Sequence, residues 1–332
     1  MGEPIFRVQN VSKAFGSHVV LDNIDLDINA GEILGIIGAS GAGKTTFLNT
    51  LIGFLRPDKG DVLFRINHLL SYKNNYIYRS VFKKQQMVKK VYGFASQTPS
   101  FYDDLTTKEN LEYFGLLHNL PRDTIKSNTE TLLNLMDLKK ASKTLAKNLS
   151  GGMERRLDIA CALMHDPDVL ILDEPTADLD PLLRSHIWEL IRKINQKGTT
   201  IILSSHHLSE LENLCERVAI IKEGKVLAVG KPESLKKQFV VEQEITIQSA
   251  PGNYKSIVKL LPKKNISRIR VAHHSLHIYA SNPEKVLLQV LATVKKRKEK
   301  LTFIKVSSAS LDDVFISIWE DKKEHKEDIR PE

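Results

Sequence analysis

The residues from Gly38 to Thr45 have the spacing of a phosphate-binding loop. They read GASGAGKT, which fits the pattern GxxxxGK[ST], and they follow the apolar run Ile33–Ile37 and precede a helical pattern. Backbone N–H groups of such a loop surround phosphate oxygens, helped by the positive end of the helix dipole. We expect Lys44 to hold the β- and γ-phosphates and Thr45 to bind Mg²⁺. The residues expected to contact the nucleotide here are Gly38, Ala39, Ser40, Gly41, Ala42, Gly43, Lys44, Thr45 and Thr46.

Two acidic residues follow a second apolar run. Val169–Leu172 is wholly apolar, as expected of a central parallel strand covered on both faces, and Asp173 and Glu174 follow it directly. This places their carboxylates at the carboxyl edge of the sheet, beside the phosphate-binding loop. We expect Asp173 to contact Mg²⁺, directly or through water, and Glu174 to be the general base for the attacking water. A strand ending in two acids is common, and its pairing with the loop favours the catalytic interpretation.

The surrounding patterns predict an α/β fold that positions these groups. Short β-type runs occupy Ile5–Val11, Leu26–Ile28 and Ile33–Ile37. A helical subdomain is expected over about residues 105–164, opened by Thr106 and Glu109 at the spacing of a capping box. Asp180 and Pro181 then suit the start of a helix, and Glu223-Gly224 suits the turn of a hairpin. These elements predict one large domain over residues 1–235.

A smaller α+β domain is expected over residues 240–320. Its expected strands and helices, in chain order, are Glu242–Gln248, Tyr254–Leu261, Ser267–Val271, Ser275–Ala280, Pro283–Val294 and Thr302–Val306. The order βαββαβ suggests a ferredoxin-like domain. A last helix is expected over Leu311–Glu320, and the polar tail 321–332 is expected to be disordered.

Composition restricts the class of protein. The 332 residues are 42% hydrophobic and 27% charged, which is ordinary for a soluble globular chain. No run approaches the roughly 18 apolar residues of a membrane span, and the first residues lack a secretion signal. The two cysteines, Cys161 and Cys215, lie in apolar helical patterns and are expected to be reduced core residues. We therefore expect a cytoplasmic location.

The segment Leu149–Met153 indicates which class of ATPase the chain resembles. Its sequence, LSGGM, resembles the LSGGQ signature that ABC-type ATPases carry shortly before the apolar strand with its acids. The chain thus resembles an ABC transporter ATP-binding subunit, a P-loop NTPase of ABC type with a mixed sheet core and a helical subdomain. The resemblance implies that Ser150, Gly151 and Gly152 grip the γ-phosphate bound by the opposite subunit. ATP is then sandwiched in a head-to-tail dimer of two copies.

Further residues acquire roles from the same resemblance. Phe15 resembles the aromatic that stacks on adenine, with a core aromatic as the alternative, and Gln97 resembles the glutamine that reaches the metal and the lytic water, with a solvent-facing residue as the alternative. Asp180 ends the segment Ala177–Asp180, which resembles the loop that contacts the other subunit's site. His206 aligns as the γ-phosphate sensor, and a one-place ambiguity with His207 stays open.

The resemblance favours an exporter. The helix after Ser150, and the ending LDDVF at Leu311–Phe315, are similar to those of drug- and lipid-exporter ATPases of bacteria and archaea. Several of these carry methionine where Met153 stands, whereas the acid at Asp178 departs from the usual small residue. Such a subunit powers a separately encoded transmembrane permease from the cytoplasmic face of the membrane.

Three other classes of protein fit the sequence less well than an exporter ATPase. An importer ATPase usually has a different carboxyl-terminal fold. A soluble ABC ATPase that acts on nucleic acid or ribosomes needs either a long coiled coil or a second cassette, and the sequence has neither heptads nor a repeat. A regulatory module with a dead site is opposed by the presence of both Lys44 and Glu174.

A basic stretch over residues 65–90 has no role in this scheme. No acid occurs between Val62 and Tyr102, while the stretch carries Arg65, Lys73, Arg79, Lys83, Lys84, Lys89 and Lys90. A solvated surface insertion is the simplest interpretation. The alternative is that these charges face the membrane subunit or anionic lipid. Interleaved tyrosines also fit single-stranded nucleic acid, which is not expected without a groove.

Overall fold

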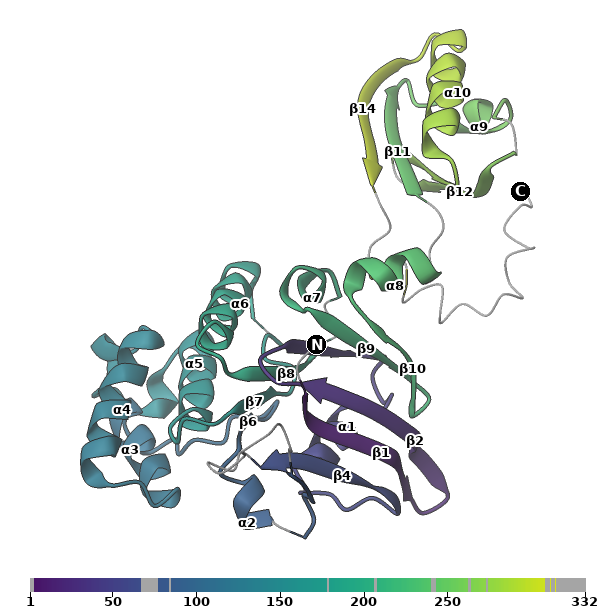
Figure 1. The fold of residues 1–332 in the computed structure, drawn as a ribbon. Helices are drawn as coiled ribbons and strands as arrows, with labels where there is room; N and C mark the ends of the chain where they lie inside the picture. Colours follow the sequence, from purple (N-terminus) through teal and green to yellow (C-terminus); the bar gives the residue numbers. More distant parts are fainter. Residues whose placement is uncertain are drawn as a thin grey trace. The chain divides into compact units, whose positions relative to one another are not determined.

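The computed structural model describes residues 3–66, 77–83, 85–177, 179–205, 208–239, 243–261, 264–272, 274–307, 311 and 314. The chain forms two compact units, Met1–Lys231 and Pro232–Glu332 (Figure 1). Predictions for His206, Asp178 and most of the helix expected over Leu311–Glu320 lie outside the described residues.

The first sheet of the amino-terminal unit is antiparallel. Its strands are β1 (Pro4–Phe15), β2 (His18–Asn29), β4 (Lys59–Ile66) and β5 (Ile77–Ser80), in the order β2-β1-β4-β5. The β1–β2 hairpin is longer than the predicted runs. Asn10 and Asn23 have φ angles of 50° and 52°, and the pairing register shifts beside both. Such bulges interrupt the alternation of apolar and polar residues, so the pattern underestimated both strands.

The second sheet carries the carboxyl-terminal strand ends that build the site. Its strands are β10 (Lys225–Gly230), β9 (Arg217–Lys222), β3 (Ile33–Ile37), β8 (Thr200–Ser205), β7 (Val169–Leu172) and β6 (Tyr92–Ala95), in that order. All neighbours are parallel except β10 and β9, which form the predicted hairpin. β7 is buried at every residue between two strands, as predicted. Because parallel strands share one carboxyl edge, β3, β6, β7 and β8 all end at the same place.

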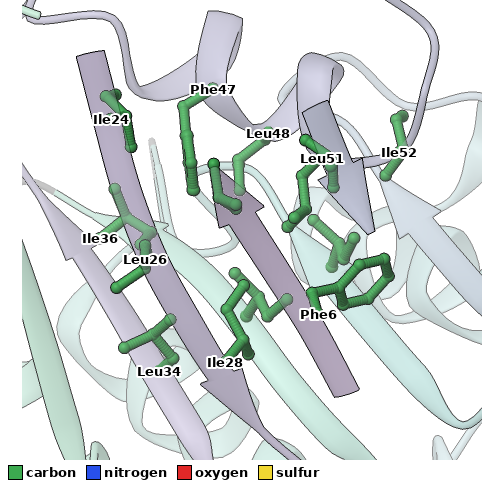
Figure 2. Close-up of a cluster of buried hydrophobic side chains, with 14 of the residues drawn as sticks. Phe6, Ile24, Leu26, Ile28, Leu34, Ile36, Phe47, Leu48, Leu51 and Ile52 are labelled. Atoms are coloured by element: carbon green, nitrogen blue, oxygen red, sulfur yellow. The ribbon is translucent and has the colours of Figure 1, made fainter. Parts of the chain in front are cut away.

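One apolar core joins the two sheets to helix α1 (Lys44–Leu51). Figure 2 shows Phe47, Leu48 and Leu51 of α1 together with side chains of β1, β2 and β3, among them Phe6 and Ile36. Phe47, Leu48 and Leu51 are at most 1% exposed. Burial of each such side chain contributes about 1.5–3 kcal/mol, so α1 is held firmly where the phosphate-binding loop ends.

Helices cover the rest of the amino-terminal unit. Those of the predicted helical stretch are α3 (Thr107–Leu117), α4 (Arg122–Leu135) and α5 (Gly151–Ala162), with the short turns η1 (Lys139–Ala141) and η2 (Ala146–Asn148). The others are α2 (Gln85–Val88), α6 (Pro181–Asn195) and α7 (Leu208–Leu214). The predicted capping box of Thr106 and Glu109 is present. None of the helices in the described part of the chain has the length and apolar character that crossing a bilayer requires.

The carboxyl-terminal unit has its own core. After α8 (Pro232–Phe239) its elements are β11 (Gln243–Ala250), α9 (Tyr254–Val258), β12 (Ile266–Ala272), β13 (Ser275–Ala280), α10 (Pro283–Lys296) and β14 (Lys300–Ser307). The sheet is antiparallel in the order β12-β13-β11-β14, so each βαβ pair is separated by another strand. That is the split βαβ arrangement of the predicted ferredoxin-like fold. Ile245, Ile278 and Val290 are fully buried in its core.

Candidate active site

The phosphate-binding loop connects β3 to α1 as the motif predicted. Gly43 has a φ angle of 100° and caps α1, so the first N–H groups of the helix have no side-chain cap. The Nζ of Lys44 donates to Gly38 O at 3.0 Å, and the residue is only 9% exposed. Carbonyl oxygens of the loop therefore hold its lysine, while the first N–H groups of α1 have no side-chain cap and can accept a phosphate as partner.

Two glycines of the loop are also required by its neighbours. A Cβ on Gly38 would lie 2.6 Å from Ile221 O of β9, and a Cβ on Gly43 would lie 2.8 Å from Val20 O of β2. Gly43 in addition has the positive φ angle that side chains disfavour. The loop is therefore clamped between two strands, and its shape depends on packing as well as on any bound phosphate.

A cavity of about 730 Å³ opens in front of the loop. Its lining residues are Phe15, Val20, Ser40, Gly41, Gly43, Lys44, Thr45, Thr46, Gln97 and Glu174. Phe15 is 52% exposed at the end of β1, which places an aromatic ring at the rim rather than in the core. Gln97 follows β6 and Glu174 follows β7, so the shared carboxyl edge of the sheet brings these side chains to the loop.

The two acids after β7 are held by one hydroxyl group. Asp173 is 2% exposed, and its Oδ1 accepts a hydrogen bond from Ser204 Oγ at 2.5 Å. The same Ser204 Oγ accepts from the backbone N–H of Glu174 at 2.9 Å. Glu174 has a φ angle of 49°, a left-handed conformation that a non-glycine residue adopts at a cost of about 1–3 kcal/mol. Ser204 thus fixes a strained turn and orients the neighbouring carboxylate.

Glu174 faces Lys44 of the loop. Its Oε1 lies 3.5 Å from the Nζ of Lys44, and the two side chains are 12% and 10% exposed. At such low exposure the pair is shielded from much of the solvent screening that weakens surface ion pairs. A carboxylate in this position can polarise a water molecule in the cavity.

The signature residues and Asp180 lie away from this cavity. Ser150 is the exposed N-cap of α5, and its side chain makes no capping hydrogen bond, while Gly151 is exposed and Gly152 is buried against Leu183. Asp180 caps α6 by accepting from the N–H groups of Leu182 and Leu183, both at 2.9 Å. The structure therefore brings Phe15, Gln97 and Glu174 to the loop residues Ser40, Gly41 and Gly43–Thr46. It leaves outside the cavity lining these four residues and also Gly38, Ala39, Ala42 and Asp173.

Ser204 is a site residue to which sequence analysis gave no role. It belongs to the segment before His206, but its contact with the acids spans 31 positions of sequence. The available signal was weak: a serine at the end of an apolar strand, where a parallel neighbour ends in two acids.

Comparison with known proteins is consistent with this geometry. The family described as "ABC transporter" matches residues 21–177. The chain is 31% identical over 318 residues to the Nod factor export ATP-binding protein I of Rhizobium sp. (strain N33), which covers 96% of this chain and 98% of that protein. It is 28% identical over 316 residues to the linearmycin resistance ATP-binding protein LnrL of Bacillus subtilis (strain 168), with 95% and 98% covered.

A solved structure is similar to most of the chain. The ATP-binding cassette MJ0796, in a dimeric post-hydrolysis state bound to ADP and Pi, has a TM-score of 0.58 and 26% identity, covering 68% of this chain and 98% of that one. The predicted ATPase of ABC type is thereby confirmed, and the chain belongs to the ATP-binding proteins of ABC transporters.

Proposed function

We propose that ATP hydrolysis by this chain drives export through a separately encoded transmembrane permease. Two relatives named for export or for drug resistance align over 96% and 95% of the chain, so the likeness extends into the carboxyl-terminal unit. The solved cassette matches only 68% of the chain. The exporter proposal therefore rests on a similarity that includes the carboxyl-terminal unit, and not on the ATPase fold alone. The cargo passes through the permease, and this chain works at the cytoplasmic face of the membrane.

The pairing of Lys44 with Glu174 at the wall of the cavity is the observation that carries the catalytic assignment. In this proposal Lys44 holds the terminal phosphates, Glu174 accepts a proton from the attacking water, and Phe15 stacks on the adenine. Gln97 orients the same water, and His206 contacts the γ-phosphate.

The proposed metal ligands fit Mg²⁺. Thr45, Gln97 and Asp173 offer a hydroxyl, an amide oxygen and a carboxylate, which are hard oxygen ligands. Among the described residues no group of three or more His, Cys, Asp or Glu could hold a metal ion. Mg²⁺ needs no such group, since it binds through one or two carboxylates together with phosphates and waters. When bound, Mg²⁺ neutralises charge on the phosphates. Ser204 Oγ donates a hydrogen bond to Oδ1 of Asp173 and so fixes the carboxylate that would help to hold the metal.

A second copy of the chain completes the site. Ser150 presents an exposed hydroxyl at the start of α5 and lies outside the cavity of its own chain, which fits a contact to nucleotide bound by another copy. Gly151, Gly152 and Asp180 join it in the proposed head-to-tail dimer. The similar cassette that was solved as a dimer supports dimerisation.

Glu174→Gln tests the assignment of the base. The amide keeps the size of the side chain but is a far poorer proton acceptor, so turnover should fall by about 100-fold or more while ATP binding persists. A stable ATP-bound dimer should then accumulate, measured by size-exclusion chromatography with and without ATP. Glu189→Gln is the matched control, because Glu189 lies on α6 with an exposed partner, Lys193. Turnover of Glu174→Gln near the parental rate would refute the assignment.

A mixed dimer tests the shared site. One copy carries Lys44→Ala and the other carries Ser150→Arg, so that one composite site has both defects and the second site has neither. This dimer should hydrolyse ATP faster than either homodimer. Equal inactivity of all three would contradict a head-to-tail dimer with independent sites.

A further inference from the structure

Arg155 lies near the start of α5 and is 7% exposed. Its guanidinium donates to three backbone carbonyls: Nη1 to Ser96 O at 2.6 Å, Nη2 to Asp173 O at 3.0 Å and Nε to Pro175 O at 2.9 Å. Five N–H donors fixed in one plane let a single guanidinium reach separate segments at once. The helix α5, which starts in the signature segment Leu149–Met153 and is called the signature helix below, is thus tied to two loops at the carboxyl edge of the sheet.

Both loops carry residues assigned to catalysis. Ser96 directly precedes Gln97, while Asp173 and Pro175 flank Glu174 on its two sides. Arg155 itself is not among the residues that line the cavity. It can therefore act on the reaction only through the backbone of these neighbours.

Asp158 extends the same network. It is 1% exposed and lies three positions after Arg155 on α5; its Oδ2 accepts from Arg155 Nη1 at 3.1 Å. Its Oδ1 accepts from the N–H of Ser100 at 3.0 Å and from the Ser100 hydroxyl at 2.9 Å. The loop that contains Gln97 is consequently held at Ser96 by the arginine and at Ser100 by the aspartate.

The charges of the two residues compensate each other inside the protein. Burial lowers the pKa of Arg155 and raises the pKa of Asp158, while their mutual attraction opposes both changes. Such a buried pair is weak evidence for stability, because well-packed apolar residues often serve as well. Apolar residues could not, however, supply donors to three carbonyls that lie outside regular structure.

We propose that Arg155 and Asp158 are positioning residues that fix Gln97 and Glu174 relative to the signature helix. The proposal rests on the proposed roles of Gln97 and Glu174. A displacement of about 1 Å in a catalytic group can lower turnover about 100-fold, so loss of this network should act on kcat. Nucleotide affinity without Mg²⁺ should change little, since Arg155 makes no hydrogen bond to the phosphate-binding loop.

The experiment compares variants of the full chain. Arg155→Met removes every donor, Asp158→Asn removes the charge but keeps an acceptor for Ser100, and the double variant removes both charges together. Arg155→Lys keeps the charge and loses the planar fork. Arg217→Gln is the matched control: Arg217 Nη1 donates to Glu32 Oε1 at 2.9 Å and to a backbone carbonyl, at the amino ends of the strands.

Each variant is measured by urea unfolding, by steady-state ATP hydrolysis, by nucleotide binding without Mg²⁺ and by hydrogen exchange of residues 96–100 and 173–177. The double variant should recover stability relative to Arg155→Met, yet keep a kcat about 100-fold below the parent and a nucleotide Kd within about threefold of it. Arg155→Lys should show an intermediate kcat. Both segments should exchange faster in the double variant and at the parental rate in Arg217→Gln.

Two results would overturn the proposal. One is a double variant or Arg155→Lys with parental kcat, which would make the network a buried ion pair only. The other is unchanged exchange in both segments. Retained turnover in Glu174→Gln would instead refute the assigned base, and the exchange measurement would still test the positioning independently.

Discussion

Replacement of Ser204 by alanine tests how the proposed base, Glu174, is held. Ser204 is fully buried, and its Oγ serves both the Oδ1 of Asp173 at 2.5 Å and the N–H of Glu174 at 2.9 Å. Loss of a hydrogen bond to a charged group costs about 1.5–3 kcal/mol, and an orphaned N–H costs about 1–3 kcal/mol. One hydroxyl group makes both hydrogen bonds, and the energies of coupled contacts are not fully additive. We therefore expect a loss of about 2–4 kcal/mol in the free energy of unfolding.

The catalytic effect follows from the backbone of Glu174. Glu174 has a left-handed conformation with φ at 49°, and its N–H donates to Ser204 Oγ. In Ser204→Ala this hydrogen bond is lost. Relaxation of this turn moves the proposed base, and turnover should fall by about 10-fold to 100-fold. Urea unfolding measures the loss of stability, and ATP hydrolysis at saturating ATP and Mg²⁺ measures the loss of turnover.

Thr200 provides the matched control on the same strand. It is 1% exposed, and its Oγ1 accepts from the N–H of Gly31 at 2.8 Å, at the amino end of β8 and away from the cavity. Thr200→Val should lower stability by about 1–3 kcal/mol and leave turnover at saturating ATP unchanged. If Ser204→Ala keeps parental stability and turnover, or if Thr200→Val lowers turnover equally, the reasoning about Ser204 is wrong.

Three further predictions concern other parts of the chain. Burial lowers the pKa of His165 from 6.5 to about 4, so between these pH values the imidazole is neutral in the folded protein and protonated in the unfolded chain. The free energy of unfolding should therefore fall as the pH drops from 6.5 toward 4, by up to about 2 kcal/mol at pH 5. Urea unfolding should show a smaller fall in His165→Gln. A Cβ on Gly93 would lie 2.0 Å from Ala162 O, so Gly93→Ala should cost about 3 kcal/mol and lower the melting temperature. Glu299 accepts from two N–H groups and a hydroxyl of residues 249–253, so Glu299→Ala should destabilise the carboxyl-terminal unit by about 2 kcal/mol without lowering ATP hydrolysis by the purified chain.

Local patterns allowed much of the fold to be predicted. The phosphate-binding loop, the capping box at Thr106 and the N-cap at Asp180 each depend on residues within a few positions of one another. The ferredoxin-like unit followed from the order of its elements, although α9 ends at Val258, before the predicted Leu261. Where bulges broke the alternation in β1 and β2, the same approach underestimated the strands.

The support of the site could not be predicted in the same way. The partners of Arg155 lie between 3 and 59 positions away, and Ser204 contacts acids 30 and 31 positions away. A single sequence gives the residue types but not which distant carbonyl or carboxylate each side chain will meet. An arginine on a helix or a serine in a strand is usually a surface or packing residue, so neither carries a signal before the sheet order is known.

The sheet order also has a consequence for biosynthesis. β3, which leads into the phosphate-binding loop, ends at Ile37, but the strands on its two sides end only at Ser205 and Lys222. At about 5–20 residues per second, roughly ten seconds or more of translation separate the strand from its neighbours. All five residues of β3 are buried in the finished protein, so an apolar, unpaired strand is exposed throughout that interval. Exposed apolar strands of this kind are prone to aggregate, so we expect β3 to need protection until β8 and β9 have been synthesised.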